Sequence, residues 1–76
     1  DIGQVHVQPH SDLDGKTIAT SGLRDTYNLS ILAIREPTGK LEITPNPNTR
    51  LRPHSELIVI GPPEAIYRLE RETMRK

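Results

Sequence analysis

The chain lacks cysteine, phenylalanine and tryptophan, and it contains only two tyrosines and one methionine. Without cysteine it can form no disulfide and no cysteine-based zinc site. Without the larger aromatic side chains, its core must be built mainly from Ile, Leu and Val. A chain of 76 residues is one domain, and a domain of that size buries only about 60% of the surface that its unfolded chain exposes. We therefore expect a homodimer, in which a second copy adds stability.

An excess of charge of one sign is also lacking, because ten Lys and Arg residues balance ten Asp and Glu residues. Binding to nucleic acid depends on clustered positive charge, so we expect no nucleic acid partner. The longest apolar runs, residues 29–34 and 57–60, are far shorter than the roughly 18 residues of a membrane-spanning helix. The chain begins with Asp1 and no signal-peptide pattern follows, which indicates a piece of a longer polypeptide.

The first half of the chain reads as a strand followed by a helical segment. Residues 2–8 alternate apolar and polar side chains, which predicts a strand with one solvated face. Thr17 is placed to cap a short helix, and the Ser21-Gly22 pair separates this helix from a second helical turn over residues 23–27. Asn28 suits a left-handed exit from that turn.

The second half of the chain predicts three strands and a helix. Residues 29–35 and 56–61 are almost wholly apolar, so we expect two strands buried on both faces. Residues 41–44 are expected to return antiparallel from a hairpin turn, and Leu51 to anchor a proline-rich crossing loop. Residues 62–76 predict an amphipathic helix, with Glu64 and Arg68 spaced to form an ion pair. The order β-α-β-β-β-α predicts an α+β fold, a mostly antiparallel sheet with helices on one face.

Catalytic and metal-binding patterns are missing from the sequence. The densest polar cluster, "HSDLDGKT" at residues 10–17, has the composition of a turn and offers no buried base beside a nucleophile. His6 and His10 are four residues apart, but Pro9 lies between them and the local period is that of a strand, so they do not share a helical face. We expect no enzyme, no catalytic residue and no metal ligand.

Arg24 allows two interpretations. It follows a helical turn near the small residues Ala19 and Gly22 and precedes a buried strand that starts at Leu29. Its guanidinium could close one side of an apolar notch and bind an anionic group through two parallel hydrogen bonds. Alternatively, Arg24 and its neighbour Asp25 form a surface pair that only solvates a loop. On general grounds the surface pair is the more common arrangement.

A resemblance to a known family covers nearly the whole chain. The segments "DLDGKTIATSGLRDTYNLSILAIRE" and "ELIVIGPPEAIYRLE" resemble the C-terminal subdomain of the regulators of potassium conductance, the TrkA-C domain. The sequence departs from the family at His54-Ser55, where Gly-Asp is usual. The matching positions are Gly15, Lys16, Thr17, Leu23, Arg24, Tyr27, Ala33, Ile34, Arg35, Leu57, Gly61, Glu64 and Ala65.

The resemblance implies that residues 1–76 are a regulatory domain of a larger transport protein. Such a domain is not an enzyme; it dimerises on the cytoplasmic side of the cell membrane and regulates a potassium channel, a potassium transporter or a cation/proton antiporter. The membrane-embedded domain belongs to the same chain or to a partner chain. In several members the groove between two copies binds cyclic di-AMP. Carried over by position, the ligand-binding residues are Ile18, Ala19, Leu23, Arg24, Leu29, Ser30 and Pro45.

At two of the predicted ligand-binding positions the sequence departs from nucleotide-binding relatives, and two alternative functions remain. Ser30 stands where some nucleotide-binding relatives have asparagine, and Ala19 stands where they have a larger aliphatic residue. One alternative is a constitutive dimerisation domain of such a transporter without a small ligand. The other is a domain regulated by a divalent cation through histidines or carboxylates. Cyclic di-AMP is the only ligand that the resemblance suggests, and no further cofactor is expected.

Overall fold

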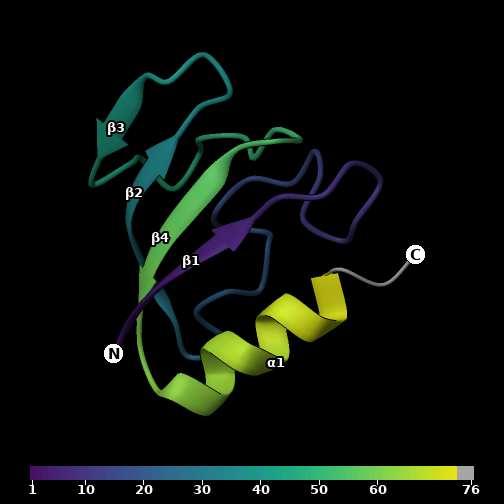
Figure 1. Ribbon diagram of the computed structural model, residues 1–76, viewed down its shortest axis with the longest axis vertical. Coiled ribbons are helices and arrows are strands. Elements are labelled where there is room, and N and C mark those ends of the chain that lie inside the picture. Colours follow the sequence, from purple (N-terminus) through teal and green to yellow (C-terminus); the bar gives the residue numbers. More distant parts are fainter. Residues whose placement is uncertain (74–76) are drawn as a thin grey trace.

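A four-stranded antiparallel sheet with one helix against it forms the fold of residues 1–73, which the computed structural model describes (Figure 1). Neighbouring strands in the order β1-β4-β2-β3 all pair antiparallel. This confirms the predicted α+β class and the predicted central position of the second strand. The elements are β1 (Ile2–His6), β2 (Ser30–Arg35), β3 (Leu41–Ile43), β4 (Glu56–Ile60) and α1 (Pro63–Thr73).

The helix predicted between the first two strands is replaced by turns. Thr17 does act as a cap, since its Oγ1 accepts the backbone N–H of Thr20 at 3.2 Å while Thr20 Oγ1 accepts the N–H of Thr17 at 3.0 Å. The capped segment ends after one turn because Gly22 takes a left-handed conformation with a φ of 81°. The next turn ends at Asn28, whose φ of 57° confirms the predicted left-handed exit. Each turn is too short to continue as a helix.

One face of the sheet carries the core. Val5, Leu57 and Val59 are at most 1% exposed on this face, where α1 packs with Ile66 and Leu69. The turns and the crossing loop complete the cover, and Leu51 is buried among them as predicted. The remaining core residues are Val7, Leu13, Leu23, Leu29 and Ile34.

The other face of the sheet is open, so the prediction that residues 29–35 and 56–61 are buried on both faces is wrong. Along β4, Leu57 and Val59 are buried, whereas Ile60 is 41% exposed. The register places Ile2 of β1 opposite Ile60, on the same open face. A single helix and its adjoining loops cover one face only, so apolar residues at alternate positions remain at the surface.

The turn before β4 keeps the backbone that a glycine would favour. His54 has a φ of 71°, and its N–H donates to the carbonyl of Val7 at 2.8 Å. A side chain other than glycine is strained in this left-handed region. The ring of His54 lies edge-on to that of His6, with 5.9 Å between ring centroids. The departure from Gly-Asp therefore places a strained side chain at a turn position where glycine is favoured.

Candidate ligand pocket

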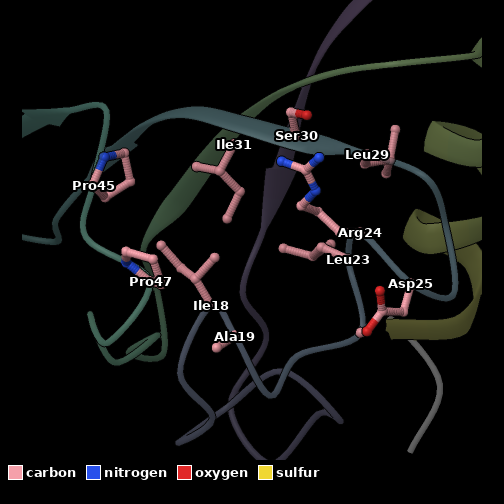
Figure 2. A pocket seen from close by; sticks show the side chains of 11 residues that line it. Ile18, Ala19, Leu23, Arg24, Asp25, Leu29, Ser30, Ile31, Pro45 and Pro47 are labelled. Carbon is pink, nitrogen blue, oxygen red and sulfur yellow. The ribbon is translucent and has the colours of Figure 1, made fainter.

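A surface pocket of about 370 Å³ lies between the start of β2, the turns before it and the loop after β3 (Figure 2). All seven residues that the sequence predicted as ligand-binding line it: Ile18, Ala19, Leu23, Arg24, Leu29, Ser30 and Pro45. The structure therefore brings together residues up to 27 positions apart in sequence. Whether they bind a ligand remains a prediction. Gly22, Asp25, Ile31 and Pro47 complete the lining.

The Arg24 loop, residues 22–29, forms one side of the pocket. Its two leucines, Leu23 and Leu29, are 1% and 0% exposed and fix the loop in the core. The carbonyl of Gly22 accepts the N–H of Thr26 at 2.7 Å, and the carbonyl of Arg24 accepts the N–H of Asn28 at 3.1 Å. These bonds form a tight turn whose exposed part carries the Arg24 side chain. The loop thus presents a cation from a firmly anchored backbone.

The proline loop, residues 45–49, forms the opposite side. The carbonyl of Pro47 accepts the N–H of Ala19 at 3.0 Å, and the carbonyl of Thr49 accepts the N–H of Ile18 at 3.1 Å. These bonds tie the proline loop to the segment that carries Ile18 and Ala19. Figure 2 shows Pro45 and Pro47 opposite Arg24 and Asp25, with the aliphatic side chains between them. One wall of the pocket is therefore apolar and rigid, and the other carries charge.

The two charged residues of the pocket, Arg24 and Asp25, do not pair with each other. Among residues 1–73, the Arg24 side chain makes no hydrogen bond and no ion pair, with Asp25 or with any other described residue. Arg24 and Asp25 therefore form no ion pair, and both interpretations of the exposed Arg24, loop solvation and binding of an anionic group, stay predictions. In Figure 2 the guanidinium of Arg24 points toward the side of the pocket where Ser30 lies, and Asp25 lies at the lower edge. Its donors are available to a group that enters the pocket.

Sequence reasoning missed two apolar residues of the lining. Ile31 lies two positions after Leu29 in an extended segment, so the strand period places both side chains on one side of the backbone. Pro47 lies in a turn, which the Thr49 N–H closes by donating to the carbonyl of Asn46 at 2.9 Å. The period of two applied to Leu29 would have found Ile31, whereas no local signal places Pro47 at the pocket.

A metal site has no support from the described residues, because no three His, Asp or Glu side chains of residues 1–73 are grouped to hold an ion. His6 and His54 are neighbours, but the structure brings no third ligand to them. Over the same part of the chain, no helix combines the length and the apolar character that crossing a bilayer requires.

The family model and the solved structures indicate the same type of domain, whereas the curated relative carries the name of an enzyme. The family model of the TrkA-C domain matches residues 2–73. A curated relative from Rhodopirellula baltica, named as a probable alpha-L-glutamate ligase, is 34% identical over 77 aligned residues. That alignment covers 99% of this chain and 18% of the relative, so the chain spans less than a fifth of that protein.

Three solved structures share the fold. The RCK C domain of the potassium transport protein KtrA, in complex with cyclic di-AMP, is 28% identical with a TM-score of 0.83, covering 93% of this chain and 80% of that one. The RCK domain of GsuK is 30% identical with a TM-score of 0.79, covering 99% of this chain and 16% of that one. The RCK_C dimer of Streptococcus agalactiae BusR with cyclic di-AMP is 20% identical with a TM-score of 0.85, covering 97% of both chains.

Proposed function

We propose, from the premise that this chain belongs to the TrkA-C domain family, that it is the ligand-sensing dimerisation domain of a potassium or cation transport protein. Two copies associate so that their pockets face each other, and cyclic di-AMP binds in the groove between them. The seven residues predicted from the sequence, Arg24 foremost, contact the ligand. The domain occupies the cytoplasmic side of the membrane and acts on a membrane-embedded partner, without catalysis.

The observation that carries this proposal is the Arg24 guanidinium, which has no protein partner among the described residues and stands on the rim of an apolar pocket. A guanidinium binds a phosphate through two parallel charge-assisted hydrogen bonds. The aliphatic and proline side chains opposite it suit the flat apolar face of a base. A ligand that joins a base to a phosphate diester therefore matches both walls.

The volume of the pocket supports a ligand shared between two copies. Pockets for small ligands measure about 300 to 1,000 Å³, so about 370 Å³ is small for a whole dinucleotide. A two-fold axis places the same patch of each copy in the interface. Each pocket would then receive one base and one phosphate of a two-fold symmetric ligand, with one Arg24 for each phosphate.

The relatives support the ligand class at different strengths. The KtrA domain, 28% identical, was solved with cyclic di-AMP, which favours the same ligand here. GsuK was also solved as a channel bound to NAD, but this chain covers 14% of it. BusR was also solved with its promoter DNA, and there the match covers 35% of that chain. This chain has no net charge, so we propose no contact with nucleic acid.

Calorimetric titration of the chain with cyclic di-AMP tests the proposal. We expect saturable heat with one ligand for two chains, and a dimer by sedimentation in the presence of the ligand. Cyclic di-GMP is the matched control for phosphate binding without adenine. Heat that is absent at micromolar protein, together with a dimer that is present, would favour the constitutive dimerisation domain instead.

A thermal melt tests the divalent-cation alternative. A ligand that binds only the folded state must raise the melting temperature by mass action. We expect calcium, manganese and zinc to leave the melting temperature unchanged, and cyclic di-AMP to raise it. For regulation, the ligand must also favour one dimer geometry over another, since equal affinity for two states shifts neither.

A further inference from the structure

Arg68 of helix α1 reaches out of its own helix to the Arg24 loop. Its Nη2 donates to the backbone carbonyl of Thr26 at 2.8 Å, across 42 positions of sequence. Its guanidinium carbon lies 4.7 Å from the centre of the Tyr27 ring, within the range of a cation–π contact. The sequence predicted that Arg68 would pair with Glu64 on the same helix, yet Glu64 forms no ion pair with any described residue.

The two contacts hold the middle of the loop. Leu23 and Leu29 anchor its two ends in the core, but Thr26 is exposed and Tyr27 is only half-buried. Arg68 fixes these two residues from outside, two and three positions after Arg24. Because the N–H of Thr26 and that of Tyr27 both donate to Gly22, a shift at Thr26 would move the turn that carries Arg24.

A second contact supports the loop from the same side. Gly61, between β4 and α1, lies so close to Leu29 that a Cβ added there would overlap the Leu29 side chain. The same Cβ would lie 3.1 Å from the carbonyl oxygen of Asn28. The start of the helical segment therefore packs against the end of the Arg24 loop, and Arg68 packs against its middle.

We propose that Arg68 is a positioning residue for the ligand pocket, through which helix α1 sets the affinity for an anionic ligand. This inference rests on the proposed function for its ligand, but its structural part concerns only the Arg24 loop. Arg68 touches the backbone that carries Arg24 and does not line the ligand pocket. Coupling between two sites is reciprocal, so a ligand held by Arg24 also stabilises α1 in its present position.

Arg71 provides a matched control. It lies on the same helix, it is exposed and it carries the same charge, but its guanidinium stacks on Tyr67 of its own helix at 5.6 Å. Removing either arginine changes the long-range field at an anionic ligand by one charge. A difference between Arg68→Ala and Arg71→Ala therefore reports the contacts of Arg68, which include those with Thr26 and Tyr27.

The first measurement is the dissociation constant of cyclic di-AMP by calorimetry. We expect Arg68→Ala to weaken binding by about tenfold, within the usual range of coupling between sites. Arg71→Ala is expected to change it by no more than about twofold, as for a surface substitution away from the site. Arg68→Lys keeps the charge but loses the planar fork, so binding of intermediate strength is expected.

The second measurement needs no ligand. Amide hydrogen exchange reports local opening, and we expect the N–H groups of Thr26, Asn28 and Leu29 to exchange about tenfold faster in Arg68→Ala. Arg71→Ala should leave them unchanged, as should the amides of β4 in both variants. If Arg68→Ala does not fold, Arg68→Lys is compared with Arg71→Lys in the same way.

The outcomes separate the two proposals. If wild-type protein binds cyclic di-AMP while the Arg68 and Arg71 variants match in affinity and in exchange, the role of Arg68 is refuted and the proposed function stands. If the wild type binds no cyclic di-AMP, the proposed function fails, and the exchange of Thr26, Asn28 and Leu29 decides the role of Arg68. Faster exchange throughout the chain in Arg68→Ala would mean a general structural role and would also refute it.

Discussion

The N–H of Leu29 donates to the carbonyl of Leu23 at 2.9 Å, and this bond joins two fully buried leucines across the loop that carries Arg24. The loop is therefore part of the core at both ends and exposed in between. A charged side chain on such a loop can be changed without loss of packing. This separation between a buried frame and an exposed cation underlies the first prediction.

Arg24→Ala should weaken cyclic di-AMP by about 10- to 100-fold, the loss expected when charge-assisted hydrogen bonds to a phosphate are removed. The melting temperature without ligand should stay the same, because the Arg24 side chain is exposed and makes no hydrogen bond or ion pair with residues 1–73. Arg52→Ala, another exposed arginine outside the pocket, is the control for lost charge. A large fall in melting temperature for Arg24→Ala would make Arg24 a structural residue.

Ser30→Asn should tighten binding of cyclic di-AMP by about threefold, since one additional hydrogen bond contributes about 0.5 to 1.5 kcal/mol. Ser30 lies at the start of β2 on the pocket wall, where the amide of asparagine can donate into the pocket. The matched control is Ser55→Asn, because Ser55 is 1% exposed and remote from the lining. That control should lower stability, and weaker binding by Ser30→Asn would place this side chain away from the ligand.

Gly61→Ala should destabilise the fold by about 2 kcal/mol, as expected for an added methyl group in a filled space. The new Cβ would meet the backbone carbonyl of Asn28 at 3.1 Å, and backbone cannot rotate away. In Gly3→Ala the new Cβ would meet Ile66 Cγ2 at 2.8 Å, a milder overlap than that of the Gly61 Cβ with Leu29 Cδ2, and no backbone atom opposes it. Chemical denaturation should therefore rank Gly61→Ala as clearly the more damaging of the two; equal losses would contradict this reading.

Leu57→Ala should cost about 2 to 5 kcal/mol, the range for truncation of a buried aliphatic side chain. Ile60 belongs to the same strand but lies on the open face and is 41% exposed. Ile60→Ala should therefore lower the free energy of unfolding by about 1 kcal/mol or less. Denaturant titrations of the two variants test which face of β4 carries the core. If Ile60→Ala lowers the free energy of unfolding as much as Leu57→Ala does, the prediction that Ile60 lies on an uncovered face of the sheet is refuted.

His54→Gly should raise the free energy of unfolding by about 0.5 to 1 kcal/mol. Glycine removes the strain of a left-handed backbone, and this gain exceeds the loss that comes from the greater freedom of glycine in the unfolded chain. A thermal melt should show a rise of about 4 °C for a domain of this size. His10→Gly is a second test of the same reasoning, since His10 has a φ of 64°. A fall in melting temperature for His54→Gly would mean that the contact with His6 outweighs the strain.

Local signals in the sequence predicted most of the fold. The alternation in residues 2–8, the glycines and prolines of the hairpin and the apolar stripe of the last helix each specify an element through its own period. The cap at Thr17 and the left-handed Asn28 were also predicted correctly, because both depend on a single side chain. The helix after Thr17 was not, since Gly22 ends the turn before a second one can form.

Tertiary placement explains what the sequence could not predict. Residues 31–34 and 57–60 are apolar at every position, so their composition does not reveal which side faces solvent until the single helix is placed. Arg68 was predicted to pair with Glu64, and the structure instead shows it donating to the carbonyl of Thr26, 42 positions away. The pocket residues came from a resemblance to a family, and the geometry that unites them depends on the proline loop meeting the turns before β2.

Four side chains of the pocket lining contribute little to the core. Ala19 and Arg24 are exposed, and Ser30 and Pro45 are half-buried, while the leucines behind them stabilise the domain. Substitutions at these four positions can therefore accumulate with little penalty to folding. Related domains with the same scaffold can therefore differ at the pocket without differing in fold.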